Sequence, residues 1–361
     1  MRRTGIGALL IPLAIIALAT ARSASADDAP PQQATYALDP HAGSWLHGPN
    51  LPAPRQDSAV AVLDGHIYVI GGFGPGGSPT TSNFVLEQPA GTNLTPSASA
   101  PPAPVFPVGS WTTARAIPEA IDHAAAAALD GFIYVAGGSV EKLVSNKFWR
   151  YDPSDDSWAT MPPLPVPRYA ATMQAFGGKL YLIGGASSHA QDERSIEVFD
   201  PATASWSLIN DALGSEREQS ETAVFAGKIV LVGGRDREEH NMASCDLYDP
   251  AHNGWTVCSN LHLARSDFGL ASVEDRLFAI GGGNLLTGTT TQTTEISGRN
   301  GEGWMDGRWL PFPREGMSVA VLGHIVWVIG GSSSDSTSPT ASVLRYVIPV
   351  VKVKLGGRAP P

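Results

Sequence analysis

The sequence has little charge, only two cysteines and, after its N-terminal segment, no long hydrophobic run. Charged residues make up 16% of the 361 residues, and the net charge is −10 without any basic stripe. This composition excludes nucleic acid as a partner, a disordered acidic chain and a long charged coiled coil. Apolar residues make up 43%, which is enough for a sizeable core. We therefore expect a folded chain with no membrane span in its mature part.

The first 26 residues have the pattern of a secretory signal peptide. Arg2 and Arg3 precede an apolar stretch from Ile6 to Ala19, and Ala24-Ser25-Ala26 is a small-residue cleavage site. The alternative is an uncleaved anchor, but the stretch is shorter than the roughly 20 residues that span a bilayer, and Pro12 interrupts it. We expect an exported protein, periplasmic or extracellular after cleavage near Ala26.

A repeat of about 48 residues organises the rest of the chain. Six Gly-Gly pairs end short apolar runs, and successive pairs are 66, 47, 49, 48 and 49 residues apart. The pairs are Gly71-Gly72, Gly137-Gly138, Gly184-Gly185, Gly233-Gly234, Gly281-Gly282 and Gly330-Gly331. In five repeats an arginine stands 16 residues before the first glycine, namely Arg55, Arg168, Arg217, Arg265 and Arg314. The second repeat has Ile121 at that place. This period is typical of propeller blades.

Each repeat predicts four short strands. Tight turns at Asp64-Gly65, Asp130-Gly131 and Gly177-Gly178 would join strands one and two, because glycine adopts a positive φ at little cost. An Asp-Pro pair separates strands three and four, and a tryptophan follows its aspartate by six residues. We expect these tryptophans, Trp158, Trp206 and Trp255, to fill the wedge between adjacent blades.

The motifs Tyr68-Val69-Ile70-Gly71-Gly72, Tyr181-Leu182-Ile183-Gly184-Gly185 and Tyr151-Asp152-Pro153 with Trp158 resemble those of kelch-repeat β-propellers. The resemblance implies an all-β, six-bladed propeller with four antiparallel strands per blade. Asp39-Pro40 and Trp45 have the usual spacing of strands three and four, so we expect the N-terminal segment to complete the last blade. Tyr36–Asp39 and Val343–Ile348 both remain candidates for its third strand.

The resemblance covers residues 36–348 as a single propeller. A linker at 27–35 would precede it, and a tail at 349–361 would follow it. The long first interval locates an insertion at 89–107, which is rich in proline, alanine and serine and is typical of a flexible surface excursion.

The charged residues are expected to gather at one end of the central channel, which we call the mouth. In a four-stranded antiparallel blade, the loops that follow strands two and four emerge on the same face, and these loops carry much of the charge. The candidate ligand-binding residues there are Asp57, His189, Arg194, Arg217, Arg235, Asp236, Arg265, Asp267 and Glu315. The alternative for the repeat arginines, which we favour, is that they brace neighbouring blades through backbone carbonyls.

Several chemistries can be set aside. The nine histidines show no zinc-like pairing, no carboxylate triplet resembles a calcium loop, and Gly281-Gly282-Gly283 lacks a phosphate-loop lysine. We therefore expect no metal and no cofactor. Copper radical oxidases share kelch repeats but need a cysteine linked to a tyrosine. We set this class aside, because the two cysteines of this chain are expected to be otherwise engaged. If Tyr248 pairs with Trp255 across a hairpin, Cys245 and Cys258 lie opposite each other, which predicts a disulfide in an oxidising compartment, with two buried thiols as the alternative.

Two classes of function remain. In the first, the propeller is a monomeric binding or interaction module for a protein or for a polar small molecule such as a sugar. In the second, it is a cofactor-free carbohydrate isomerase, because bacterial kelch propellers include sialic-acid mutarotases. Anomer exchange needs only a general base and a general acid. For that case we hypothesise Glu218 or Glu239 as base, His240 as acid and Arg237 as the anchor of a carboxylate.

Overall fold

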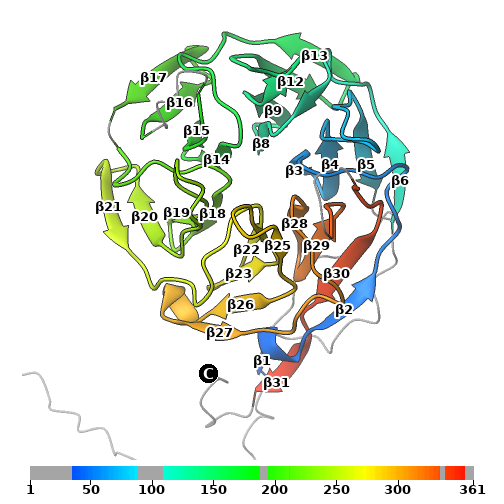
Figure 1. Cartoon of the computed structure of the whole chain (residues 1–361), viewed down its shortest axis with the longest axis vertical. Coiled ribbons are helices and arrows are strands. Elements are labelled where there is room, and N and C mark those ends of the chain that lie inside the picture. The colour runs from blue at the N-terminus through cyan, green and yellow to red at the C-terminus, as the bar shows by residue number, and fades with distance from the viewer. Residues whose placement is uncertain (1–34, 88–108, 188–193, 211, 334–337, 354–361) are drawn as a thin grey trace, which may run out of the picture.

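The computed structural model describes residues 35–87, 109–187, 194–210, 212–333 and 338–353 (Figure 1). Within these residues the chain forms six four-stranded antiparallel sheets that follow one another around a common centre (Figure 1). The predicted all-β class with four antiparallel strands per repeat is confirmed. The predicted signal peptide, His189 and the whole of the predicted insertion at 89–107 lie outside the described residues.

In the first five sheets the strands run from the centre outward in chain order. The first sheet consists of β3 (Ala59–Leu63), β4 (His66–Ile70), β5 (Asn83–Glu87) and β6 (Ser110–Thr113). The second consists of β8 (Ala125–Leu129), β9 (Phe132–Ala136), β12 (Phe148–Asp152) and β13 (Ser157–Thr160). The third consists of β14 (Thr172–Phe176), β15 (Lys179–Ile183), β16 (Ile196–Asp200) and β17 (Ser205–Ile209). The next two are β18 (Glu221–Phe225), β19 (Lys228–Val232), β20 (Cys245–Asp249) and β21 (Gly254–Val257); and β22 (Gly269–Val273), β23 (Arg276–Ile280), β26 (Thr294–Ser297) and β27 (Trp304–Asp306).

The last sheet combines the two ends of the chain. It consists of β28 (Ser318–Leu322), β29 (Ile325–Ile329), β30 (Val343–Val347) and, as its outermost strand, β2 (Ser44–His47). Trp45 of β2 pairs with Tyr346 of β30. Of the two candidates for the third strand, the C-terminal one therefore occupies that position. The N-terminal candidate contributes to β1 (Thr35–Leu38), which pairs with β31 (Val350–Val353) in a separate two-stranded sheet (Figure 1).

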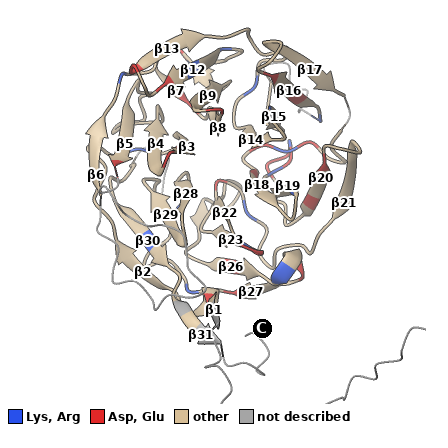
Figure 2. Ribbon diagram, turned by 180° about the vertical axis from the view of Figure 1, so that it is seen from behind, with Lys and Arg blue, Asp and Glu red and all other residues tan. Residues whose placement is uncertain are grey.

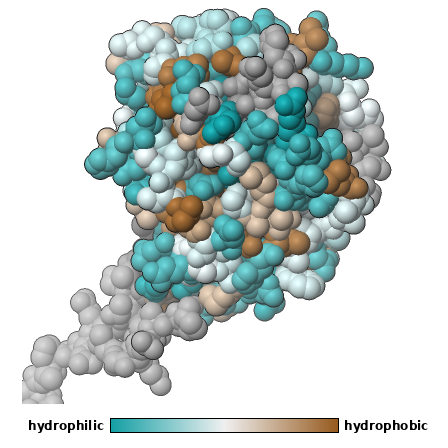
Figure 3. Space-filling view, turned by 60° about the vertical axis from the view of Figure 1, so that its left-hand side comes forward, coloured by the Kyte–Doolittle hydropathy of each residue, from teal (hydrophilic) through white to brown (hydrophobic). Residues whose placement is uncertain are grey.

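Short elements decorate this framework. Two 3-10 helices, η2 and η3, comprise Pro40–Ala42 and Arg299–Gly301. Small strands extend several of the loops between strands two and three or precede a first strand. They are β7 (Ile121–Asp122), β10 (Ser139–Val140), β11 (Leu143–Val144), β24 (Gly283–Asn284) and β25 (Thr289–Thr290). Among the described residues no helix is long and apolar enough to cross a membrane. Figure 3 shows hydrophilic residues over most of one side of the molecule, with hydrophobic ones in small groups.

The core lies between neighbouring sheets. Six hydrophobic clusters each combine residues of two adjacent sheets, and every innermost strand contacts the innermost strands on both sides. Trp158 packs against the cluster that joins Ile70 of one sheet to Ile133 of the next. Its indole Nε1 also donates a hydrogen bond to the carbonyl of Arg115, 3.0 Å away, in the segment before that second sheet. The predicted wedge position of this tryptophan is confirmed.

The Gly-Gly pairs connect each repeat to the next. Both glycines of each pair have a positive φ, and a Cβ on Gly137 would lie 2.4 Å from the carbonyl oxygen of Arg168 in the following repeat. The second glycine, Gly138, donates its N–H to that same carbonyl at 2.8 Å. Equivalent bonds join all six repeats, from Gly72 to Ile121, Gly185 to Arg217, Gly234 to Arg265, Gly282 to Arg314 and Gly331 to Arg55. Only glycine lets the two backbones approach so closely.

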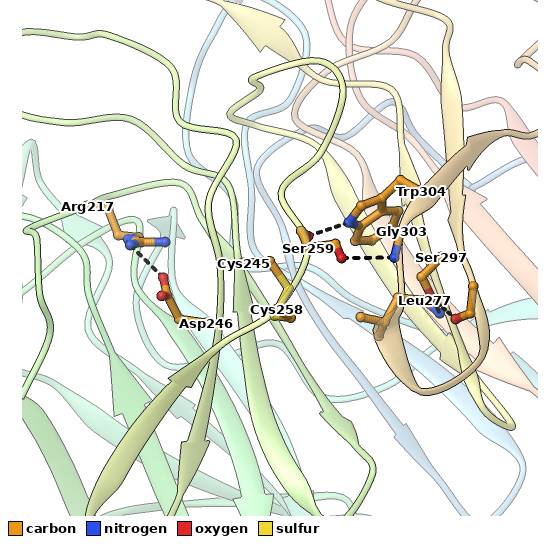
Figure 4. Close-up of a disulfide and its surroundings, with 10 residues drawn as sticks. Arg217, Cys245, Asp246, Cys258, Ser259, Leu277, Ser297, Gly303 and Trp304 are labelled. Carbon is orange, nitrogen blue, oxygen red and sulfur yellow. Dashed lines mark hydrogen bonds and ion pairs between the residues drawn. A yellow bond between two sulfur atoms is a disulfide. The ribbon is translucent and has the colours of Figure 1, made fainter.

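A disulfide joins strands three and four of the fourth sheet. Cys245 at the start of β20 is bonded to Cys258, which follows β21 (Figure 4). Tyr248 pairs with Trp255 in this hairpin, and the backbone N–H of Cys258 donates to the carbonyl of Cys245 at 2.9 Å. The predicted register and the predicted disulfide are both confirmed.

Candidate functional site

A ring of six residues surrounds the mouth. Each stands two positions after the repeat arginine, or after Ile121 in the second repeat, and each has a φ between 49° and 59°. The ring residues are Asp57, His123, Ala170, Gln219, Asp267 and Gly316. The N–H of each one donates to the carbonyl of the ring residue in the preceding repeat, and Asp57 donates to Gly316. These six bonds, 2.8 to 3.3 Å long, form a closed circle of backbone hydrogen bonds.

Side chains from this ring converge on one cavity. It has a volume of about 440 Å³, and its polar lining includes Asp57, His123, Gln219 and Asp267 of the ring. The residues that precede ring positions add Gln56 and Glu315, while Phe73 and Leu285 supply apolar surface. The ring thus joins the backbones of all six repeats, and the side chains of four of its members line a single site. We call this space the mouth cavity.

A second cavity of about 500 Å³ lies between the six innermost strands and forms the central channel. Its walls are largely alanine, valine, serine and threonine side chains. Glu221, the first residue of β18, is the one ionisable residue among the described residues that line it. The titratable side chains that line the two cavities are therefore concentrated at the mouth.

His123 connects two carboxyl groups at the mouth cavity, one through a hydrogen bond and one through a longer charge contact. The ring of His123 lies with Nδ1 2.8 Å from Oδ1 of Asp122 and with Nε2 3.7 Å from Oδ2 of Asp57. Gln56 donates its amide Nε2 to the same oxygen of Asp57 at 3.1 Å. His123 thus lies between two carboxylates, a position that favours its protonated form.

Burial and mutual charge shift the pKa values of these groups. Burial raises the pKa of Asp267 to about 8, with help from the negative charge of Asp57. Burial also raises the pKa of Asp57, although the charge of His123 opposes the shift. For His123, burial lowers the pKa, but Asp57 and the hydrogen bond to Asp122 outweigh it and raise the pKa to about 9. Burial and Asp267 raise the pKa of Glu221 to about 8. At neutral pH the mouth cavity thus contains a protonated Asp267 beside a cationic His123.

The loop at 235–240 begins at the mouth and turns away from it. The side chain of Arg235 lines the mouth cavity, and its Nε donates to Oε1 of Glu218 at 2.8 Å. Oδ1 of Asp236 accepts the backbone N–H groups of Glu238 and His240, at 3.0 and 2.9 Å, which folds the loop back on itself. Figure 2 shows basic and acidic residues side by side on the loops next to β18.

The structure separates the four residues that the sequence suggested for acid–base chemistry. Glu218 is half-buried at the mouth in its ion pair with Arg235, whereas Arg237, Glu239 and His240 are exposed on the loop. The same loop carries a grouping that the sequence did not suggest. Asp236, Glu238 and His240 each offer one possible metal-ligand atom within 4.8 Å of the others, the one such grouping of three in the described residues.

The repeat arginines are buried within their own sheets. Nη1 of Arg265 donates to the carbonyls of Gly281 and Thr293 at 2.8 and 3.2 Å, and Nη2 donates to Oε1 of Glu295 at 2.6 Å. Arg217 is 4% exposed and pairs with Asp246 (Figure 4). The expected bracing of neighbouring blades by arginine side chains is therefore wrong in its geometry. The arginine side chain donates hydrogen bonds to groups of its own sheet. The link to the neighbouring repeat is made by the arginine's backbone carbonyl, which accepts a hydrogen bond from the second glycine of the preceding repeat.

The predicted ligand-binding residues divide into two groups. Asp57, Arg235, Asp267 and Glu315 come together around the mouth cavity. Arg194 is exposed elsewhere and donates its Nε to the carbonyl of Leu213 at 3.0 Å. Arg217, Arg265 and Asp236 have the partners described above.

Sequence reasoning missed several residues of the site. Gln56, Phe73, Gln219 and Leu285 line the mouth cavity although none of them is charged. The position relative to the repeat arginine could have found two of them, because Gln56 follows Arg55 by one residue and Gln219 follows Arg217 by two. Phe73 directly follows its Gly-Gly pair, the position that Arg235 has in the fourth repeat, whereas no pattern in the sequence points to Leu285.

Comparison with known families gives a result that matches this geometry. Residues 108–282 match the family model "KLHDC2/KLHL20/DRC7 Kelch-repeats domain", and residues 54–86 match the "Kelch motif". Beta-scruin of Limulus polyphemus is 27% identical over 178 residues, which cover 46% of this chain and 18% of that protein. Kelch-like protein 35 of Mus musculus is 27% identical over 165 residues, covering 46% of this chain and 25% of that protein. The matches thus span a quarter or less of either relative.

A comparison with solved structures addresses the fold alone. "Structure of YjhT" superposes with a TM-score of 0.69 and 18% sequence identity, and the match covers 82% of this chain and 95% of that one. The matched residues include five of the six Gly-Gly pairs and most of the strands of the first five sheets. The chain is therefore a protein of Kelch repeats, arranged as antiparallel four-stranded sheets in a propeller-like fold.

Proposed function

We propose that this chain is an exported binding module, a six-bladed propeller that takes a polar ligand in the mouth cavity. One observation carries the proposal: ring residues from four different repeats, Asp57, His123, Gln219 and Asp267, line one cavity of about 440 Å³. This volume lies in the usual range for small-molecule sites, and convergent polar side chains in a concave site favour a specific ligand. The ligand is a small polar molecule or a side chain presented by a protein, since Kelch relatives are typically interaction modules.

Other observations support the remaining parts of the proposal. The pairing of β2 with β30 and the closed circle of backbone hydrogen bonds support a closed ring of six blades. The disulfide between Cys245 and Cys258 supports folding in an oxidising compartment. The pattern of the first 26 residues supports export by a signal peptide.

A ligand panel with matched variants tests the binding site. Neutral sugars, carboxylates and amines are screened by saturation-transfer NMR against the unmodified chain and against Gln219→Ala. Alanine fits this ring position, because Ala170 occupies the equivalent place with the same positive φ. We expect Gln219→Ala to weaken the binding of any ligand of the mouth cavity without changing the melting temperature.

The control for this test is a pair of substitutions on the exposed loop, Arg237→Ala and Glu239→Ala. If these two abolish binding while Gln219→Ala leaves it intact, the loop is the binding site and the proposal for the mouth cavity is wrong. A ligand that binds equally well to all variants would place the site elsewhere on the molecule.

A second candidate function is cofactor-free acid–base isomerisation of a sugar. The observation in its favour is the pair of groups with pKa values near neutrality in one cavity, Asp267 at about 8 and His123 at about 9. In this assignment Asp267 supplies the acid at neutral pH, and the neighbouring carboxyl group of Asp57 is the candidate base. This assignment moves the chemistry from the predicted Glu239 and His240 to the ring.

Anomer-exchange NMR with reducing sugars, sialic acid included, tests the isomerase. The expected result is accelerated exchange that is lost in Asp267→Asn and retained in Glu239→Ala. If no sugar exchanges faster than in buffer, the isomerase is excluded and the binding module remains.

A further inference from the structure

Buried hydrogen-bond acceptors without partners lie at the mouth cavity. Gln56 is 3% exposed, yet its Oε1 has no hydrogen-bond partner among the described residues. The same holds for Oε1 of Gln219 and for Oε2 of Glu218. A buried acceptor without a donor costs about 1–3 kcal/mol, so these oxygens favour a ligand that brings N–H or O–H groups.

Carboxyl groups outnumber basic groups around these acceptors. The basic groups are His123 and Arg235, and the Nε of Arg235 is already bonded to Glu218. The carboxyl groups at the mouth or just inside the channel are those of Asp57, Asp122, Glu218, Glu221, Asp267 and Glu315. An anionic ligand would oppose the ionisation of these carboxyl groups, whereas a cation would favour it by offsetting the repulsion between Asp57 and Asp267 when both are ionised.

Apolar surface flanks the acidic part of the cavity. Phe73 lies beside His123, with 5.6 Å between the ring centroids, and lines the cavity. Leu285 lies on the loop between β24 and β25, is 53% exposed and lines the same cavity. The hydroxyl of Thr290, in β25, donates to the carbonyl of Ser333 at 2.7 Å and ties this hairpin to the last repeat.

We propose that the mouth cavity binds a cationic group, an ammonium or a guanidinium, carried on a short apolar body. The charged head would donate to Asp57, Asp267 and the free oxygen of Gln56, and the body would contact Phe73 and Leu285. This inference rests on the function proposed above, because it names the class of ligand for the same cavity. The cation is either a free amine or a lysine or arginine side chain of a peptide.

Three ligands of matched shape test the charge requirement. Isothermal titration calorimetry at pH 7 compares n-butylguanidinium with the neutral n-butylurea and with the anion butyrate. We expect n-butylguanidinium to bind at least about tenfold more tightly than n-butylurea, because it makes charge-assisted hydrogen bonds. Methylguanidinium should bind more weakly than n-butylguanidinium if Phe73 and Leu285 contact the body. Equal or tighter binding of the urea or of butyrate overturns the inference.

Two aspartate-to-asparagine variants locate the cation. Asp267→Asn should weaken n-butylguanidinium at least about tenfold, and asparagine tolerates the positive φ of this position, so the fold is retained. Asp306→Asn, on the outer strand β27 and exposed, is the matched control and should change nothing. If Asp267→Asn binds as tightly as the unmodified chain, the inference is wrong. Asp57→Asn provides a second test if Asp267→Asn is unstable.

Proton release on binding distinguishes direct contact between Asp267 and the cation from a merely structural role of Asp267. Because Asp267 is largely protonated at pH 7 without ligand, a bound cation should displace about one proton. The groups that face it are Asp57, Glu221, Glu315, His123 and Arg235, and all five side chains remain in the variant. Calorimetry in two buffers of different ionisation enthalpy measures the number released. Release that persists unchanged in Asp267→Asn contradicts the assignment.

A pair of peptides distinguishes the two sources of the cation. Acetyl-Gly-Arg-Gly-amide is compared with the same peptide containing citrulline and with free n-butylguanidinium. Tighter binding of the arginine peptide indicates a protein partner, and tighter binding of the free cation indicates a small amine; both agree with the inference. If a neutral sugar binds and is lost in Gln219→Ala while no cation binds, the proposed site stands and the cationic ligand is refuted.

Discussion

The buried ion pair of the third repeat gives the sharpest test of how the repeat arginines stabilise the fold. Arg168 and Glu197 are both 0% exposed, and Nη2 of the arginine lies 2.9 Å from Oε1 of the carboxylate. The same guanidinium donates to the carbonyls of Gly184 and Ser195, at 3.1 and 3.2 Å. Replacing Arg168 with methionine keeps the apolar stem but removes every one of these donors.

The magnitude follows from what the substitution leaves behind. Glu197 keeps the backbone N–H of Val166 as a donor but loses the guanidinium of Arg168, its ion-pair partner, so its buried charge is less well compensated. Breaking a buried pair in this way costs about 3–5 kcal/mol. The comparable Arg314 donates to the carbonyls of Gly330 and Ser342 and has no carboxylate partner among the described residues. For Arg314→Met we expect a smaller loss of about 1–3 kcal/mol.

Urea unfolding of the full chain measures both losses from the midpoint and the slope. A double variant, Arg168→Met with Glu197→Gln, should recover at least about 1 kcal/mol, because a neutral amide is cheaper to bury than a carboxylate. If Arg168→Met loses no more stability than Arg314→Met, or if the double variant recovers nothing, the ion pair is not what stabilises this repeat.

Three further predictions concern the glycine pairs, the disulfide and the mouth. Gly137→Ala should destabilise the chain by about 2 kcal/mol more than Gly131→Ala in urea unfolding, because a Cβ meets a carbonyl at the first site and open space at the second. Replacing Cys245 and Cys258 by serine should lower the free energy of unfolding by about 3 kcal/mol, whereas adding reductant to that variant should have no effect. Asp267 binds its proton more tightly when folded, so its contribution to stability is lost as pH rises from 3.8 to about 8, and Asp267→Asn should flatten the stability profile there.

The sequence predicts the repeats well because their signals are local. The pair Asp64-Gly65 predicts a tight hairpin turn from two neighbouring residues alone. The pairing of Tyr248 with Trp255 fixes the register that brings Cys245 opposite Cys258. For the third strand of the last sheet the sequence predicts two candidates, because β1 and β30 both have the apolar pattern of a strand. Only the register of β2 on β30 distinguishes them.

The candidate site was predicted in part, and the errors have a physical cause. Asp57 and Asp267 were expected at the mouth because they follow the repeat arginines. The sequence analysis assigns acid–base roles to residues of the loop at 235–240 because this loop has many charged residues. Its direction depends on one side chain, Asp236, which accepts two backbone N–H groups and leaves the tip exposed. A neutral residue such as Gln56 gives no signal in the sequence, because its importance comes from burial without a partner.

The circle of six backbone hydrogen bonds around the mouth has a consequence for how this protein can change. Its members are an acid, an imidazole, a methyl group, an amide, a second acid and a glycine, yet all six share one backbone conformation. The peptide groups therefore carry the shape of the opening, and the side chains carry its selectivity. Exchanging the six side chains for another set would give a binding site for a different ligand on an unchanged frame.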